Sequence, residues 1–136
     1  MEQRSDDANE FAWAGYLWAA PVTMAAIGIG LVLGARFRLI EGVVEMCGPR
    51  VATVLRRLPN PALAMTLGHA VFGQNHDGLE KTRRHEHVHV HQYARWGLFF
   101  IPVYLGWSAW LYARGRDGYR ENPFEIEAFA VDDPTR

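Results

Sequence analysis

The sequence contains one cysteine, Cys47, which excludes a framework of internal disulfide bonds. It has no surplus of basic residues either, because 14 Lys and Arg stand against 15 Asp and Glu and leave a net charge of -1. Without such a surplus to neutralise a phosphate backbone, nucleic acid is not an expected partner. Internal repeats and low-complexity tracts are also lacking, and an apolar content of 49% excludes a disordered chain. With 136 residues, the chain is long enough for one folded domain.

Charged side chains are missing over a long stretch near the start of the sequence, residues 11–35. As a helix this stretch would be about 37 Å long, enough to cross the hydrocarbon core of a bilayer, which is about 30 Å thick. Trp13, Tyr16 and Trp18 stand near its beginning, where aromatic rings favour the membrane boundary. We therefore predict a polar tail over residues 1–10 and a transmembrane anchor over residues 11–35. Acidic residues before the stretch disfavour a secretory signal peptide, and a buried core helix is the remaining alternative.

The charges beside this stretch indicate its orientation in a membrane. Only Arg4 precedes it, whereas several arginines follow it: Arg36, Arg38, Arg50, Arg56 and Arg57. Because basic residues gather on the cytoplasmic side, we expect the N-terminus outside and the bulk of the chain in the cytoplasm.

A second apolar block, residues 96–113, also lacks charge but is interrupted by glycine and proline. As a helix it would reach about 27 Å, which is marginal for crossing a bilayer. Arginines flank it equally on both sides, whereas a spanning helix usually shows an asymmetry of basic charge. We predict that this segment dips into or lies along one leaflet, with a second span as the alternative.

Two segments carry the pattern of β-strands. Residues 36–47 predict a hairpin with its turn at Glu41 and Gly42, because β-branched and alternating residues flank a glycine turn. Residues 64–72 predict one buried strand, which ends at a turn-rich stretch over residues 75–78.

Helices are predicted over residues 49–58, 79–96 and 123–130, the last capped by Asn122. Pro59-Asn60-Pro61 stops the first of them, and residues 131–136 form an acidic tail. Together these patterns predict an α+β fold. It consists of an N-terminal transmembrane helix, a small sheet, a central helix, a membrane-dipping segment and a short C-terminal helix.

The predicted central helix contains the motif H-E-x-x-H at residues 85–89. Helical residues four positions apart lie one above the other, so His85 and His89 can offer their imidazoles to one Zn²⁺. Glu86 then lies close enough to act as general base on a water molecule.

The other two histidines of this segment, His87 and His91, would point to the opposite side of the helix. The alternative is a strand, in which all four histidines of the segment would line one face. An array that binds haem or the magnesium of a pigment through His87 or His91 is a further alternative.

A hydrolytic zinc site needs a third protein ligand and an open fourth position. Two carboxylates, Glu125 and Glu127, lie at the start of the predicted C-terminal helix. With Glu125 and Ala128 in an E-x-x-A spacing, the chain resembles the gluzincin metallopeptidases, in which a glutamate in such a helix follows the H-E-x-x-H motif. The resemblance implies Glu125 as the third ligand and Glu127 as the fallback. It also implies that the strand over residues 66–72 borders the substrate cleft.

The chain as a whole is similar to a family of small bacterial membrane proteins. The shared features are an apolar N-terminal segment and motifs that here occupy residues 66–69, 85–93 and 122–125. This resemblance implies a bacterial inner membrane as the location and supports a bound metal, but it implies little about a substrate. His69 or Tyr119 could polarise a substrate carbonyl, with core or surface roles as the alternative.

Two functional interpretations follow. The first is a membrane-anchored zinc hydrolase, a peptidase, with a zincin-like domain over residues 36–130 and peptide or protein substrates. The second is a non-catalytic accessory subunit of a larger membrane complex, for example photosynthetic or respiratory, in which a metal is structural or absent. The zinc interpretation requires residues 96–113 to return to the same membrane face, because a full crossing would separate Glu125 from the histidines.

Overall fold

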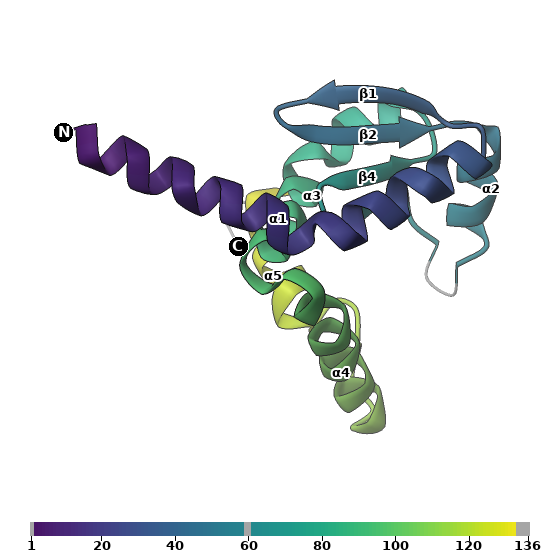
Figure 1. Cartoon of the computed structure of the whole chain (residues 1–136). Helices are drawn as coiled ribbons and strands as arrows, with labels where there is room; N and C mark the ends of the chain where they lie inside the picture. The colour runs from purple at the N-terminus through teal and green to yellow at the C-terminus, as the bar shows by residue number, and fades with distance from the viewer. Residues whose placement is uncertain (1, 59–60, 133–136) are drawn as a thin grey trace.

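The computed structural model describes residues 2–58 and 61–132 and shows an α+β fold (Figure 1). Pro59 and Asn60 of the predicted stop, and residues 133–136 of the predicted tail, lie outside the described residues. The elements follow in the order α1 (Glu2–Val32), β1 (Arg36–Ile40), β2 (Val43–Cys47), α2 (Pro49–Arg56), β3 (Ala64–Leu67), β4 (Ala70–Gly73), α3 (His76–Trp96), the 3-10 helix η1 (Gly97–Phe99), α4 (Phe100–Ala113) and α5 (Pro123–Asp132).

The four strands form one mixed sheet in the order β1-β2-β4-β3. Strands β2 and β4 run parallel, and each outer strand runs antiparallel to its neighbour. The hairpin predicted over residues 36–47 is confirmed, with Ile40 paired to Val43 across a two-residue turn. Glu41 and Gly42 take positive φ values of 53° and 78°, as the tight turn of a hairpin requires.

The single strand predicted over residues 64–72 is wrong, because the chain reverses within it. The segment forms β3 and β4, an antiparallel pair in which Leu67 lies opposite Ala70. Gly68 in the turn has a φ of 64°, a conformation that glycine adopts without steric cost. A side chain at this position would collide with Thr23 of α1, so the turn and the helix fit closely together.

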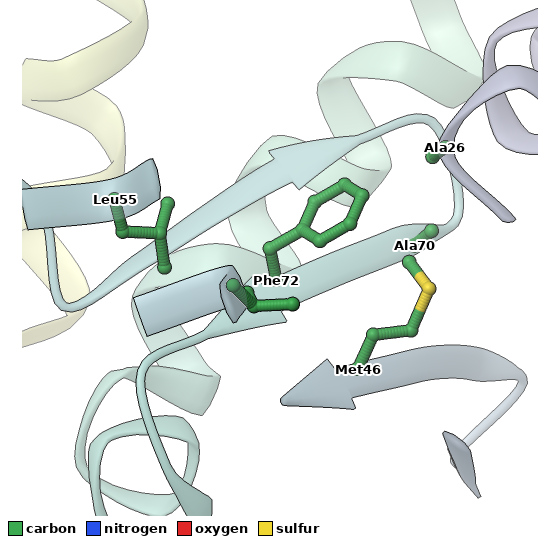
Figure 2. Close-up of a cluster of buried hydrophobic side chains, with 6 residues drawn as sticks. Ala26, Met46, Leu55, Ala70 and Phe72 are labelled. Carbon is green, nitrogen blue, oxygen red and sulfur yellow. The ribbon is translucent and has the colours of Figure 1, made fainter. Parts of the chain in front are cut away.

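Helices cover both faces of the sheet, with α1 and α2 on one face and α3 on the other (Figure 1). Figure 2 shows the first of these layers, where Met46 and Phe72 of the sheet meet Ala26 of α1 and Leu55 of α2. The second layer lies between the sheet and α3 and contains Val43, Cys47, Ala64, Val71, Leu79 and Val90.

Helix α1 begins at Glu2, so the residues expected as a polar tail are helical from position 2 onward. Its stretch Ala14–Val32 is long and apolar enough to cross a membrane. Only 28% of the most apolar part of this stretch is buried inside the protein, so most of its apolar surface is exposed.

One side of α1 is fitted against the rest of the domain. Gly15 lies so close to Ala94 of α3 that a side chain there would press on it, and Ala26 is fully buried against the sheet. The opposite side of the helix has no partner among the described residues and exposes Leu17, Met24 and Leu31. Helix α1 is therefore apolar on both its packed and its unpacked side.

The central helix α3 starts at His76 rather than at Leu79. Asn75 caps it, because its side-chain oxygen accepts a hydrogen bond from the backbone N–H three residues later at 2.7 Å. The turn predicted here is therefore the cap and first turn of the helix. Because α3 continues to Trp96, residues 85–91 are helical and the strand interpretation is wrong.

The apolar segment over residues 96–113 is split by a bend. Helix α3 ends at Trp96, Gly97 takes a φ of 57°, and η1 leads into α4, which extends away from the sheet (Figure 1). After α4 the chain turns back, and Ser108 Oγ donates a hydrogen bond to the backbone carbonyl of Gly118 at 2.7 Å. This return brings α5 against α3, as a shared metal site requires.

Candidate metal centre

Two histidines of α3 and one glutamate of α5 converge on a single point. Nε2 of His85 and Nε2 of His89 each lie 3.2 Å from Oε2 of Glu125. All three side chains are buried, and their ligand atoms lie within 4.8 Å of one another. This cluster could hold a metal ion, because imidazole nitrogens and a carboxylate oxygen are common metal ligands.

Glu125 reaches the histidines because of the way α5 begins. Asn122 precedes the helix, and its Oδ1 accepts a hydrogen bond from the backbone N–H of Phe124 at 3.0 Å. Pro123 occupies the first helical position, where its missing N–H is no loss. The predicted cap and helix start are thus confirmed, and Glu125 stands in the first turn, directed at α3.

Neighbouring polar groups fix the orientation of the ligands. Nδ1 of His89 lies 2.8 Å from Oε1 of Gln92, an oxygen that can only accept, so Nδ1 carries hydrogen and Nε2 faces the cluster. Gln92 is held in turn by donating to the backbone carbonyl of Phe124 at 2.9 Å. Tyr104 of α4 donates its hydroxyl hydrogen to Oε1 of Glu125 at 2.7 Å, which leaves Oε2 for the histidines.

Glu86 lies in the same helix but is held by the sheet. The hydroxyl of Thr66 in β3 donates a hydrogen bond to Oε2 of Glu86 at 2.6 Å. Burial raises the pKa of the Glu86 carboxyl, although the charges of His89 and His85 and the bond from Thr66 act against it. A carboxyl whose pKa is raised in this way suits a group that takes up and releases a proton during a reaction.

The charges of the cluster stabilise one another. Burial opposes ionisation of Glu125, but hydrogen bonds from His85, His89 and Tyr104 outweigh it and lower the pKa of its carboxyl to about 2. Burial also lowers the pKa of His89, yet the hydrogen bond and charge of Glu125 prevail and raise it. A divalent cation would replace the proton that His89 holds in this arrangement.

A cavity of about 440 Å³ opens beside the cluster, between β3, α3 and α4. His85, Glu86, His89 and Glu125 all line it, so the cluster and the raised-pKa carboxyl face the same space. Most of the remaining wall is apolar and includes Met65, Leu67, Phe100, Ile101 and Leu105. The cavity therefore combines one polar corner with walls that suit an apolar group.

Of the other three site residues predicted from the sequence, one lines this cavity and two do not. Tyr119 lines it, with its ring against that of Phe129. Glu127, the fallback ligand, points to the surface, where its Oε1 accepts a hydrogen bond from Arg95 at 2.8 Å. His69 does not line the cavity and lies against α1 instead, with its ring stacked on Tyr16.

Three residues of the site were not predicted from the sequence: Thr66, Gln92 and Tyr104. Gln92 could have been found, because it stands three residues after His89 and such pairs meet on a helix. Thr66 and Tyr104 reach the site only through packing of β3 and α4, and no local pattern indicates them.

No protein-family model matches this chain. Neither a curated protein nor a solved structure matches it. The resemblance to gluzincins therefore stays a prediction, and the function is inferred from the geometry of the site.

Proposed function

We propose that this protein is a membrane-anchored zinc-dependent hydrolase that cleaves peptides or proteins. The observation that carries the proposal is the convergence of His85, His89 and Glu125 in one cavity with Glu86. A buried carboxylate that only stabilised the fold would not need two imidazoles directed at the same oxygen.

The ligand set fits zinc. Two histidines and one glutamate leave a fourth tetrahedral position open, the arrangement of catalytic rather than structural zinc sites. Gln92 supports the fit, because a histidine that binds zinc through one nitrogen commonly donates from the other to an oxygen. Zinc bound here would lower the pKa of a water molecule and polarise a substrate carbonyl.

Three residues around this zinc ion would then have separate roles in the reaction. Glu86 accepts the proton of the attacking water and later returns it to the leaving group, a role that its raised pKa supports. Thr66 holds the Glu86 carboxylate in place through its hydroxyl. Tyr119 lines the same cavity and is the candidate to bind the substrate carbonyl as charge develops on it.

Peptides suit the site because of strand β3. It lies at one edge of the sheet, and no described strand pairs with its outer side. Met65, Thr66 and Leu67 of this strand line the cavity, so an extended peptide could add to the sheet there. The apolar wall formed by Phe100 and Ile101 favours substrates with an apolar side chain next to the cleaved bond.

Membrane anchoring rests on two helices whose outer surfaces are apolar. Helix α1 can cross a bilayer by its length and composition, and α4 exposes apolar side chains on most of its surface, among them Leu105, Trp107, Trp110 and Tyr112. Such a helix is unstable in water and suits the interface of a lipid leaflet. With the N-terminus outside, as the flanking arginines predict, the site faces the cytoplasm at the surface of a bacterial inner membrane.

The test compares Glu86→Gln with Glu80→Gln, a matched change at an exposed position of the same helix. Both proteins are purified in full length in lipid, loaded with zinc, and assayed on quenched fluorescent peptides that carry apolar residues. Glu86→Gln should retain zinc and lower kcat by about 10²- to 10⁴-fold, the usual contribution of a general base. Glu80→Gln should behave as the wild type.

Equal activity of the two variants would remove Glu86 from the mechanism. Zinc-loaded wild-type protein that cleaves no peptide would support the second candidate, an accessory subunit of a larger membrane complex. The exposed apolar surface of α1 and α4 would then contact partner subunits instead of lipid.

A further inference from the structure

Helix α4 reaches the carboxylate of the candidate metal centre through Tyr104. The hydroxyl of Tyr104 donates a hydrogen bond to Oε1 of Glu125 at 2.7 Å, whereas Oε2 of the same carboxylate lies 3.2 Å from both histidine nitrogens. An ionised carboxylate only accepts hydrogen bonds, so the direction of the bond is fixed. The two oxygens of Glu125 are therefore used differently, because one faces the cluster and the other is held by α4.

This difference decides how many positions around a metal ion the protein would occupy. A carboxylate can bind a metal through one of its oxygens or through both. With His85 and His89, one oxygen of Glu125 makes three protein ligands and leaves the fourth tetrahedral position of zinc open. Two oxygens would make four protein ligands and fill the position that a catalytic site needs.

Asn122 fixes Tyr104 and Glu125 relative to each other. Its Nδ2 donates to the backbone carbonyl of Tyr104 and to Oγ of Ser108, both in α4 and both at 3.0 Å. Its Oδ1 accepts from the backbone N–H of Phe124 in the first turn of α5, the turn that carries Glu125. Because Asn122 is fully buried, these hydrogen bonds are shielded from water. Helices α4 and α5 are thus joined where the phenol meets the carboxylate.

The ring of Tyr104 is also held by its aromatic neighbours. It stacks on Phe124, with ring centroids 6.2 Å apart and planes inclined by 19°, and its centroid lies 5.6 Å from that of Phe100. A phenol hydroxyl lies in the plane of its ring and moves only with it. The hydroxyl therefore cannot leave Oε1 of Glu125 unless the ring gives up both contacts.

We propose that Tyr104 is a positioning residue of the metal centre: by holding Oε1, it limits Glu125 to one metal-binding oxygen and keeps the fourth position open. The inference rests on the proposed function, because it needs a metal ion at the cluster. It gives α4 a part in the site that the H-E-x-x-H motif of α3 does not contain. Tyr104 acts on the reaction through Glu125.

The test uses cobalt(II), which replaces zinc in tetrahedral sites and absorbs visible light more strongly with four ligands than with five. Full-length wild-type protein and Tyr104→Phe are purified in lipid and loaded with cobalt ions alone. The wild type should show the strong absorption of four-coordinate cobalt. Tyr104→Phe removes only the hydroxyl, so Oε1 of Glu125 is free to bind and the absorption per bound cobalt should fall to that of five-coordinate cobalt.

Tyr112→Phe is the matched control. Tyr112 lines the same cavity from the same helix, but it lies eight residues, or about 12 Å, further along α4. This variant should have the spectrum of the wild type. A purely structural role of Tyr104 would change how much protein folds and binds cobalt, but not the spectrum of the cobalt that is bound.

Two results would overturn the proposal: equal absorption per bound cobalt in the wild type and in Tyr104→Phe, or a five-coordinate spectrum in the wild type. Circular dichroism shows whether Tyr104→Phe folds. If it does not, Tyr104→Leu, which also lacks the hydroxyl, supplies the measurement.

Cleavage of peptides by the zinc-loaded proteins separates this proposal from the hydrolase. Tyr104→Phe should lower kcat by about 10- to 100-fold, the usual effect of removing a group that orients a ligand. If the spectra differ as expected but the wild type cleaves no peptide, the role of Tyr104 stands and the hydrolase fails. If the wild type cleaves peptides and the spectra are equal, the hydrolase stands and the role of Tyr104 is overturned. A wild type that takes up neither cobalt nor zinc overturns both.

Discussion

Helices α3 and α4 follow each other in the chain, yet α3 buries a group of polar side chains and α4 exposes large apolar ones. Helix α3 buries His85, Glu86, His89 and Gln92, whereas α4 buries little beyond Phe100 and Leu111 and exposes its other large apolar side chains. In a protein surrounded by water the usual distribution is the reverse. The difference agrees with a polar site on α3 that could hold a metal and with an apolar environment around α4.

The buried polar groups of α3 are stable only because each is paired with a specific partner. His89 with Gln92, and Glu86 with Thr66, exchange lost hydration for hydrogen bonds. The apolar side chains that α4 exposes, such as Leu105, are stable at the surface only in lipid or against another protein. Four experiments test whether the two helices differ in this way.

The largest effect is expected for Glu125→Gln, which removes the charged ligand from the cluster on α3. Zinc affinity should fall by at least about 100-fold, since changes that only support a ligand already cost about 10- to 100-fold. Glu127→Gln is the matched control, because Glu127 lies in the same helix and bonds Arg95 at the surface. Competition with a zinc-binding dye measures both, and equal affinities would remove Glu125 from the ligands.

A smaller loss is expected for Gln92→Ala, which leaves every ligand in place. Without the acceptor at 2.8 Å, His89 is free to rotate, and zinc affinity should fall by about 10- to 100-fold. Gln74→Ala is a control at a distance, because its side chain donates to the backbone carbonyl of Ala62 and does not line the cavity. An unchanged affinity in Gln92→Ala would mean that packing alone orients His89.

The environment of α4 can be tested by labelling. A polarity-sensitive fluorophore on Trp107→Cys should emit at shorter wavelength in phosphatidylcholine vesicles than the same label on Arg56→Cys of α2. Native Cys47 will compete little, because it is buried and burial raises the pKa of its thiol. Identical emission from both labels would show that α4 faces water or a protein partner instead of lipid.

The smallest effect is a change of stability with pH in the metal-free protein. Burial raises the pKa of Glu86 above 4.5, and the bond to Glu125 raises that of His89 above 6.5 against the effect of burial. Both groups then hold more protons in the folded than in the unfolded chain, so the free energy of unfolding falls as pH rises through these pKa values. The loss is about 1.4 kcal/mol for each tenfold difference in proton affinity between the folded and unfolded chain.

Urea unfolding of chelator-treated protein measures this dependence, with the midpoint of the wild type, relative to that of His89→Gln, expected to be lower at about pH 8 than at about pH 5. The comparison isolates His89, because burial lowers the pKa values of His69 and His87 and these two histidines act in the opposite direction in both proteins. Excess zinc should reverse the order, because the metal competes with protons and binds better at higher pH. The same dependence with and without zinc would contradict a shared site. Glu125 contributes in the other direction only in acid, as its pKa is lowered to about 2.

Much of the site could be predicted from the sequence because its signals are local. The spacing of His85 and His89 specifies one face of a helix, and Asn122 with Pro123 marks the start of the helix that carries Glu125. The hairpin with its turn at Glu41 is local in the same sense. Periodicity and capping act over a few residues, and a sequence displays them directly.

The parts of the fold and of the site that could not be predicted depend on contacts between distant parts of the chain. The reversal at Gly68 is specified by the fit of a turn against α1, and the run of small and apolar residues around it gives no sign of this. Asn75 stood in a turn-rich stretch that equally describes a loop or a helix cap. Tyr104 enters the site only because the chain folds back along α4.

The hydrogen bond from Tyr104 to Glu125 connects helix α4, with its exposed apolar surface, to the candidate metal centre. Helix α4 exposes Trp107 and Trp110, and it also contains Tyr104, whose hydroxyl orients the Glu125 carboxylate. In the membrane-anchored hydrolase that we propose, extraction from the bilayer would let α4 bury its exposed side chains elsewhere in the protein, and Glu125 would lose the hydrogen bond from Tyr104. We therefore expect catalysis to be latent in detergent-free solution and restored on contact with lipid, which would confine cleavage to chains at the membrane and spare those in the surrounding fluid.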